Sequence, residues 1–457
     1  MRARLRWLPL AWVLIAVLAP SWTTASLPLE LDAEADAQQL VKRLAAGEFE
    51  AATERFDETM RGALPPDRLK ATWAQVEGSL GKLVSVLRTT SQKARSSTIV
   101  LVTCRFERTV FDVKIVYAAD ESIEGLWFLP TPPGYRFEPP PYADASRFSE
   151  SPVTIGDVNW SLPATLSLPK GEGPFPAIVL VHGSGPQYRD ETVGGHKVFR
   201  DLAQGLATRG IAVLRYEKRT RHYAALLTPV PGHFTVDDET VDDAVSAVRF
   251  LQQTKAVDNE RLYLAGHSLG GLLAPRIGRR APELRGLVLL AASIRPTDIV
   301  LAEQLEYLAG LDGEVTAEER KPIEEIRAFF AYLDDPVAKG PAPPCELLSN
   351  VPVNYWRHMR AYDAGAAARD FAGRILVLQG ERDYQVTLAD FEAWKKELAG
   401  HERTKFLQYP GLNHLFVEGN GTPSPQEYAG EGHVAENVVA DIAAWILEPA
   451  AAPDDDE

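Results

Sequence analysis

Ser268 stands in the pentapeptide Gly266-His267-Ser268-Leu269-Gly270, which directly follows an apolar, strand-like run at 262–265 and precedes a helical run. In a sharp strand-to-helix turn of this kind the serine hydroxyl is exposed, and glycines flank it because Cβ atoms would clash. The N-terminus of the following helix favours negative charge. We therefore expect Ser268 to act as a nucleophile, with the backbone N–H of Leu269 binding the oxyanion that its attack creates. The alternative interpretation is an ordinary glycine-rich turn.

A second glycine-rich segment, His182-Gly183-Ser184-Gly185, follows another apolar run at 177–181. A loop in this position can supply a second N–H to an oxyanion, and each such donor stabilises a tetrahedral intermediate by roughly 2.7–4 kcal/mol. Ser184 is the expected donor, with Gly185 as its rival. We expect His182 to brace the loop rather than to react.

A carboxylate is expected after the apolar run at 375–378, where the segment Glu381-Arg382-Asp383 turns out of a strand. An acid in this place, after the nucleophile in the chain, fits the order Ser, Asp, His. We prefer Asp383 to Glu381, since Glu381 lies nearer the strand end and is expected to pair with Arg382.

A histidine is expected in the loop beyond the last strand, and His414 follows the strand-like run at 405–408. We prefer it to His433, which opens a helix. His401 stands at a helix end and is interpreted as a solvated surface residue.

These roles define a complete acyl-transfer mechanism. His414 takes the proton of Ser268 as the hydroxyl attacks a carbonyl carbon, while Asp383 fixes the histidine tautomer and stabilises the imidazolium. Water then hydrolyses the acyl-enzyme. The chemistry needs neither a metal nor an organic cofactor, so we expect none.

The net charge and the small number of cysteines limit the classes of function that the chain can have. A formal net charge of −15 over 457 residues argues against a nucleic-acid partner, because binding phosphates needs clustered Lys and Arg. Four acidic residues end the chain and indicate a solvated tail at 448–457. Cys104 and Cys345 are too few for a disulfide framework, and we expect the first in a buried strand and the second in a loop.

The first 25 residues have the pattern of a secretory signal peptide. Arg2, Arg4 and Arg6 precede an apolar run at 8–19, and small residues follow up to Ala25. This run is shorter than the ~20 residues that a membrane span needs. We expect cleavage near Ala25, export to the periplasm or the medium, and no membrane span in the mature protein; an uncleaved anchor is the alternative.

The remaining patterns divide the chain into two domains. Within 26–130, helical patterns near 40–44 and 67–80 precede strand-like runs at 83–87, 98–106, 110–117 and 123–129, which predicts a small α+β domain. Prolines from 130 to 141 indicate a stiff linker at 131–145. Over 146–447 strands alternate with helices, which predicts a mostly parallel sheet covered on both faces, and a helical stretch at about 296–366 predicts a cap.

Six longer segments carry a closer resemblance: 181–192 (VHGSGPQYRDET), 199–210 (FRDLAQGLATRG), 213–220 (VLRYEKRT), 266–275 (GHSLGGLLAP), 378–386 (LQGERDYQV) and 409–416 (YPGLNHLF). Through them the chain resembles two-domain bacterial α/β-hydrolases, often called carboxylesterases, which join a DUF3887-type (NTF2-like) domain to a serine hydrolase. The resemblance is weaker in the N-terminal domain. It implies an α/β-hydrolase fold with a helical cap, the triad Ser268, Asp383 and His414, and activity on short-chain acyl esters.

A small-molecule ester is therefore the expected substrate. A thioesterase, a peptidase or a carbohydrate deacetylase with the same triad stays open, because only the resemblance favours an esterase. A non-catalytic binding protein is the alternative from another class. The charged run Arg215, Glu217, Lys218 and Arg219 belongs to the resembling segments, and we expect it to be salt-bridged or solvated without a catalytic role.

Overall fold

The computed structural model describes residues 32–94, 97–106, 110–130, 138–224, 226–227, 230–429 and 432–448. Two compact units divide the chain, and the described residues 32–130 fall in one and 138–448 in the other. The predicted signal peptide at 1–25 lies outside the described residues, as do most of the predicted acidic tail and the first half of the predicted linker.

The N-terminal unit is an α+β domain, as predicted. Its antiparallel sheet has the order β1-β2-β3-β4, formed by Leu83–Ala94, Ser97–Phe106, Val110–Tyr117 and Ile123–Pro130. The two predicted helices are α1 (Ala33–Ala46) and α4 (Pro66–Leu80), and between them lie two short helices that periodicity did not reveal, α2 (Phe49–Ala52) and α3 (Glu58–Ala63). At four and six residues, α2 and α3 are too short to display a helical repeat.

The core of this unit lies between the helices and one face of the sheet. Leu40 and Leu44 of α1 and Trp73 of α4 pack with alternate residues of the central strands, such as Val100 and Val102. Asp32 caps α1 by accepting a hydrogen bond from the N–H of Ala35 at 3.1 Å. Cys104 is buried in the same core and is a free thiol, in agreement with its predicted place in a strand.

The second unit is built on an eight-stranded sheet with the order β14-β13-β12-β11-β7-β10-β6-β5. From β14 to β10 each pair of adjacent strands is parallel, whereas β6 pairs antiparallel with both β10 and the edge strand β5. In chain order they are β5 (Phe148–Gly156), β6 (Ser161–Pro169), β7 (Phe175–Val181), β10 (Ala212–Tyr216), β11 (Val257–His267), β12 (Leu284–Leu290), β13 (Arg374–Gly380) and β14 (Thr404–Tyr409). The prediction of a mostly parallel sheet is confirmed.

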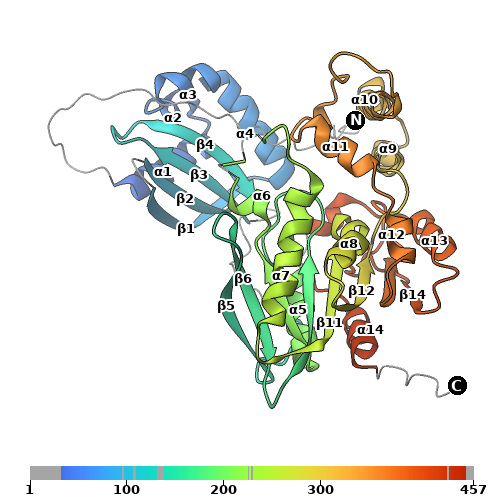
Figure 1. Cartoon of the computed structure of the whole chain (residues 1–457). Coiled ribbons are helices and arrows are strands. Elements are labelled where there is room, and N and C mark those ends of the chain that lie inside the picture. The colour runs from blue at the N-terminus through green and yellow to red at the C-terminus, as the bar shows by residue number, and fades with distance from the viewer. Residues whose placement is uncertain are drawn as a thin grey trace, which may run out of the picture. The chain divides into compact units, whose positions relative to one another are not determined.

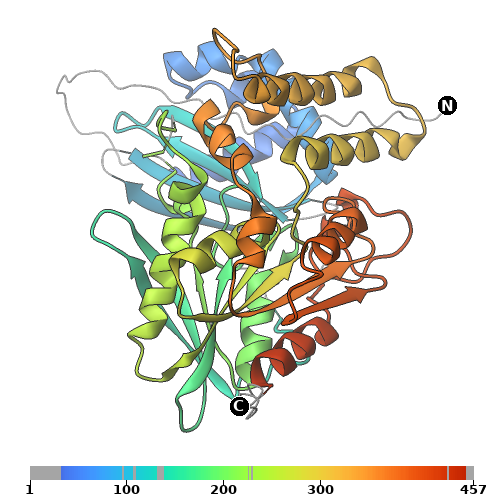
Figure 2. The same ribbon diagram turned by 45° about the vertical axis from the view of Figure 1, so that its right-hand side comes forward.

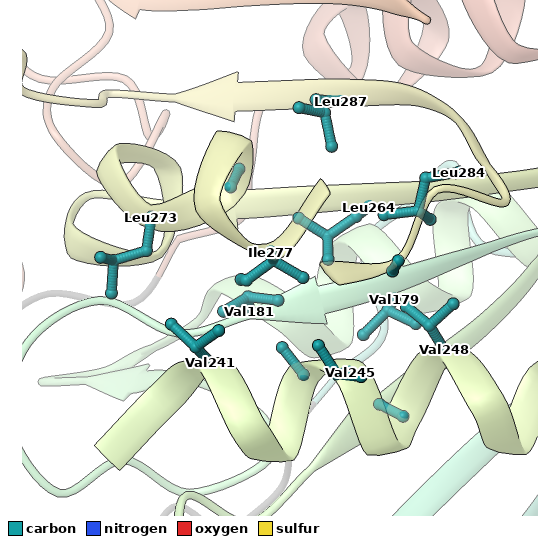
Figure 3. Close-up of a cluster of buried hydrophobic side chains, with 14 of the residues drawn as sticks. Val179, Val181, Val241, Val245, Val248, Leu264, Leu273, Ile277, Leu284 and Leu287 are labelled. Carbon is teal, nitrogen blue, oxygen red and sulfur yellow. The ribbon is translucent and has the colours of Figure 1, made fainter. Parts of the chain in front are cut away.

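Helices cover both faces of this sheet (Figure 1). On one face α7 (Asp242–Gln252) and α8 (Leu269–Arg280) pack against Val179 and Val181, as Figure 3 shows, and α13 (Leu388–Glu397) extends the same core over β13. On the other face α5 (Val198–Thr208) and α14 (Glu436–Leu447) pack against Ile178 and Leu180. Burial on both faces explains why β7 is apolar throughout rather than alternating.

The cap predicted at 296–366 contains α9 (Thr297–Ala309), α10 (Ala317–Asp334) and α11 (Val353–Arg360). Figure 2 shows α9 and α10 side by side. Phe329 and Phe330 form a small core of the cap together with Cys345 and Leu348, so Cys345 is buried although it lies in an irregular segment. A capping box of Thr316 and Glu319 starts α10. None of the helices in the described ranges has the length and apolar character needed to cross a membrane.

Residues 138–145, the second half of the predicted linker, are bonded to the second unit. The hydroxyl of Tyr142 donates to the carbonyl oxygen of Val434 at 2.6 Å. The N–H of Asp144 donates to Oγ1 of Thr208 at 3.0 Å. The domain boundary at 145 stays a prediction, but these bonds group residues 138–145 with the second unit.

Candidate active site

Ser268 sits on a strained turn between β11 and α8. Its backbone has φ 52° and ψ −116°, a conformation that residues other than glycine rarely adopt. A Cβ on Gly266 would lie 2.1 Å from the carbonyl oxygen of Gly270, and a Cβ on Gly270 would lie 2.2 Å from that of Val181. Both glycines are therefore required for the turn. Leu269 is the first residue of α8, so its N–H has no acceptor within the helix and is available to a ligand.

The loop 182–191 follows the adjacent strand β7 and reaches the same turn. A Cβ on Gly183 would lie 3.2 Å from Cβ of Ser268, so the loop backbone runs directly beside the expected nucleophile. The N–H of Gly183 donates to Oε1 of Glu191 at 2.7 Å and is therefore occupied. Ser184 is exposed and is the next N–H along the loop. His182 is buried and contacts the carbonyl oxygen of Tyr188 at 3.1 Å, which agrees with the predicted bracing role.

Asp383 is buried at the end of β13, and four groups hold its carboxylate. Oδ1 accepts from the N–H groups of Gln385 and Val386 at 2.8 and 2.9 Å. Oδ2 accepts from Nε2 of Gln379 at 3.1 Å and contacts Nδ1 of His414 at 2.7 Å. The geometry fits a carboxylate that orients an imidazole.

Glu381 lies in different surroundings from Asp383. Its side chain is exposed, whereas Asp383 is only 5% exposed. The expected pairing of Glu381 with Arg382 is wrong, because Arg382 pairs with Glu427, which comes from a distant part of the chain.

His414 lies in the loop after β14 and is buried. Oδ1 of Asn413 accepts from the N–H groups of Leu415 and Val417 at 3.0 and 3.3 Å, and this fixes the loop around the histidine. The two histidines that were weighed against it bind other groups. Nδ1 of His433 contacts Asp201 at 3.2 Å, and both ring nitrogens of His401 are hydrogen-bonded.

The interpretation of His401 as a solvated surface residue is therefore wrong. Its Nε2 contacts the carbonyl oxygen of Phe371 at 2.8 Å and its Nδ1 contacts Oγ1 of Thr404 at 2.8 Å. The imidazole ties the end of one loop to the start of β14, a tertiary role that its place after Gly400 did not indicate.

His267, the residue before Ser268, joins the nucleophile turn to the histidine loop. Its Nε2 contacts the carbonyl oxygen of His414 at 2.9 Å, and the two imidazole rings have centroids 4.7 Å apart. The nucleophile turn, the loop 182–191, the acid and the histidine thus gather at the carboxyl ends of β11, β7, β13 and β14, which share one edge of the sheet.

Glu191 is a buried partner of this site that sequence reasoning missed. Its Oε2 lies 3.2 Å from Nδ1 of His267. Burial is the largest single influence on the pKa of His267 and lowers it, but the charge and contact of Glu191 together with the hydrogen bond to the carbonyl oxygen of His414 outweigh it and hold this pKa above its ordinary value. Burial is also the largest single influence on the pKa of Glu191 and raises it, but the charge and contact of His267 together with the hydrogen bond from the N–H of Gly183 outweigh it and hold this pKa below its ordinary value. In the sequence, Glu191 stands out only because it belongs to the segment 181–192, one of the segments through which the chain resembles the carboxylesterases. That segment did not indicate which residue Glu191 contacts.

Comparison with known proteins agrees with this architecture. Residues 178–431 match the model of the alpha/beta hydrolase family, and residues 37–126 match a family described as a protein of unknown function, DUF3887. Esterase EstD of Thermotoga maritima is 34% identical over 408 residues, which cover 89% of this chain and 94% of that protein.

More distant similarities cover a smaller share of the chain. A pimeloyl-[acyl-carrier protein] methyl ester esterase of Xanthomonas axonopodis pv. citri is 30% identical over 161 residues, or 34% of this chain and 54% of that protein. The structure of Est1E from Butyrivibrio proteoclasticus with ferulic acid matches 65% of this chain and 98% of its own at 17% identity and a TM-score of 0.43. On the family match and the full-length similarity to EstD, the chain belongs to the alpha/beta hydrolase family and carries an N-terminal DUF3887 domain.

Proposed function

We propose that this protein is a serine carboxylesterase that hydrolyses short-chain acyl esters through an acyl-enzyme intermediate. The observation that carries the proposal is the 2.7 Å contact between Nδ1 of His414 and Oδ2 of Asp383, at the same sheet edge as the strained turn of Ser268. Membership of the family and the similarity to an esterase over most of the chain support the reaction class.

In the proposed mechanism Ser268 attacks the ester carbonyl and His414 accepts the hydroxyl proton through Nε2. Asp383 holds Nδ1, which fixes the tautomer and stabilises the imidazolium. The imidazolium then protonates the leaving alcohol, and a water activated by His414 hydrolyses the acyl-enzyme. The N–H groups of Leu269 and Ser184 bind the oxyanion in both steps.

Covalent labelling tests the nucleophile. Wild-type protein is expected to react with a fluorophosphonate and to hydrolyse p-nitrophenyl acetate and butyrate, whereas Ser268→Ala does neither. Folded wild-type protein that is not labelled would point instead to a non-catalytic binding protein.

Substrate profiling tests the reaction class within the same triad chemistry. Short and long p-nitrophenyl esters, acyl thioesters, aminoacyl amides and acetylated sugars are compared by kcat/KM. We expect the short esters to be the best substrates. Efficient amide cleavage with negligible ester turnover would identify a peptidase, and a preference for thioesters or acetylated sugars would identify a thioesterase or a deacetylase.

We also propose that residues 1–25 are removed during export and that the remaining chain divides at 26–130, 131–145, 146–447 and 448–457, with a cap at about 296–366. The basic and apolar pattern of the first 25 residues supports export. The N-terminal sequence of protein recovered from the periplasm or the medium tests it, with a start near Ser26 as the expected result.

A further inference from the structure

Lys218 is a buried cation immediately after β10, and it has a carboxylate partner. Its side chain is 2% exposed, and Nζ lies 2.8 Å from Oε1 of Glu239 in the π-helical turn Asp237–Val241. The hydroxyl of Tyr355, in the cap helix α11, donates to Oε2 of Glu239 at 2.5 Å. Both oxygens of Glu239 therefore have a partner, and the opposite charges of the buried pair compensate each other, while the ammonium of Lys218 keeps donors for other acceptors.

Lys218 also donates two hydrogen bonds to the loop 182–191. Its ammonium donates to the carbonyl oxygen of Gly183 at 2.7 Å. Its backbone N–H donates to the carbonyl oxygen of Gln187 at 3.1 Å. An ammonium has three N–H donors, so the bond to Gly183 satisfies a donor that the ion pair leaves over, and its choice of acceptor ties Lys218 to the loop 182–191.

The carbonyl of Gly183 and the N–H of Ser184 belong to one peptide group. A trans peptide is planar, and its C=O and N–H point in opposite directions. A cation bound to the oxygen therefore fixes the direction of the N–H on the other side. It also polarises the peptide, which makes the N–H a stronger donor. Since the N–H of Gly183 is bound to Glu191, buried charged side chains hold Gly183 from both ends.

We propose that Lys218 is a positioning residue of the oxyanion hole, which orients and polarises the Gly183–Ser184 peptide so that the Ser184 N–H meets the oxyanion. The inference rests on the proposed function, in which that N–H is an oxyanion donor. Donors of this kind act by being fixed before the reaction, so a loosened peptide lowers the rate of the chemical steps and leaves substrate binding unchanged.

The competing explanation is that Lys218 only holds the fold together at the end of β10. Lys218→Met combined with Glu239→Gln separates the two roles, because it removes both buried charges and leaves none unpaired. The matched control is Arg219→Met combined with Asp243→Asn. This removes the neighbouring buried ion pair, with oxygen–nitrogen distances of 2.5 and 3.1 Å, which makes no contact with the loop 182–191 that the structure records.

Steady-state kinetics on p-nitrophenyl butyrate are measured per active site, with active sites counted from the p-nitrophenol burst. In the Lys218→Met/Glu239→Gln protein we expect kcat to fall by about 10- to 100-fold with KM unchanged, below the full effect of deleting a donor. Inhibition by an alkyl trifluoromethyl ketone, which forms a tetrahedral adduct with the serine, is expected to weaken by the same factor. The control pair is expected to lower thermal stability while both quantities stay within about twofold of wild type.

Unchanged kcat and unchanged ketone affinity in the Lys218→Met/Glu239→Gln protein would overturn the inference, as would an equal loss in the control. If the double variant does not fold, the single variant Lys218→Gln is used instead. The glutamine side chain is one atom shorter than lysine, and its amide still donates to Glu239. The kcat and the ketone affinity of this variant then decide in the same way. The parallel Ser268→Ala protein keeps the two proposals apart. If it retains activity, the serine mechanism is wrong, whereas an inert Ser268→Ala protein with normal Lys218 variants overturns the Lys218 inference alone.

Discussion

The carboxylate of Asp383 is held by four hydrogen-bonding groups, and its contact with His414 is the shortest of them. Asp383→Asn keeps the size of the side chain but presents an amide to Nδ1, which favours the wrong tautomer of the histidine. We expect kcat for p-nitrophenyl butyrate to fall by roughly 10⁴-fold, as in other triads of this type. Glu381→Gln, an exposed neighbour, is the matched control and is expected to keep wild-type activity. A loss below tenfold in Asp383→Asn, with a large loss in the control, would assign the acid to Glu381.

The buried pair of Glu191 and His267 makes a prediction about stability and pH. The pKa of His267 is raised, so its contribution is complete below its unfolded value of about 6.5 and is lost as pH rises through the folded value. The pKa of Glu191 is lowered, so its contribution is present above about 4.3 and is lost as pH falls through the folded value. The pair therefore stabilises the fold most between about pH 4.3 and 6.5.

Glu191→Gln tests this window. Removing one partner of a buried ion pair destabilises proteins by about 3 kcal/mol, so we expect a difference of that order from wild type in the free energy of unfolding at pH 5.5. The difference is expected to shrink as pH rises from 6.5 to 9, because the contribution of His267 is lost as pH rises through its raised pKa. Urea unfolding at pH 5.5 and at pH 9 measures both differences, with Glu381→Gln as a control that shows neither. Equal differences for Glu191→Gln at both pH values would contradict the assignment.

At the scale of elements, patterns of contiguous residues predicted the features that depend on contiguous residues, namely the strands and the turn around Ser268. The turn around Ser268 could be read from the sequence because two glycines, an apolar run before and a helix after are all contiguous. The places of Asp383 and His414 followed from a second regularity, since residues after parallel strands meet at one edge of the sheet. The predicted strands of both units were observed, with ends that differ by up to seven residues, as at β1.

The partners of these residues could not be predicted in the same way. Glu191 reaches His267 across 76 positions of the chain, and Lys218 meets Gly183 only because β7 and β10 are neighbours in the sheet. The sequence of a charged run such as the one at 215–219 does not distinguish solvated side chains from buried ones. Only the packing of β10 against β7 decides that Lys218 is inside the protein.

Among the bonds that join the cap helix α11 and the residues just after it to the segments below are a charged hydrogen bond and a neutral one. The hydroxyl of Tyr355 donates to the carboxylate of Glu239 at 2.5 Å, and the hydroxyl of Tyr362, just after α11, donates to the carbonyl oxygen of Leu272 at 3.2 Å. Tyr355→Phe leaves Glu239 short of a donor in a buried place. We expect it to lower the free energy of unfolding by about 1.5–3 kcal/mol, the range for hydrogen bonds to charged groups.

Tyr362→Phe is the matched control for this prediction, because it removes a hydroxyl of the same kind from a neutral acceptor. We expect it to lower the free energy of unfolding by about 1 kcal/mol. Urea unfolding of the two variants and of wild type compares the effects. A larger loss in Tyr362→Phe than in Tyr355→Phe would show that Glu239 does not depend on the cap.

At the scale of the whole molecule, each unit has a hydrophobic core of its own. Every buried residue of the N-terminal core lies between 37 and 123, and every buried residue of the cores around the large sheet and in the cap lies between 155 and 446. All the strands and loops that carry the candidate site belong to the second unit. The second unit therefore holds both a complete core and a complete set of proposed catalytic groups.

A fragment that starts at Glu138 tests this independence. We expect it to fold, to react with a fluorophosphonate, and to hydrolyse p-nitrophenyl acetate with a kcat within about threefold of the full chain, because an acetyl ester requires little beyond the triad and the oxyanion donors. The same fragment with Ser268→Ala is the control for background hydrolysis. Turnover of longer esters by the fragment and the full chain then measures what the DUF3887 domain adds to substrate choice. A fragment that is insoluble, or folded but unreactive, would show that the hydrolase unit depends on residues before 138 for its structure or for its chemistry.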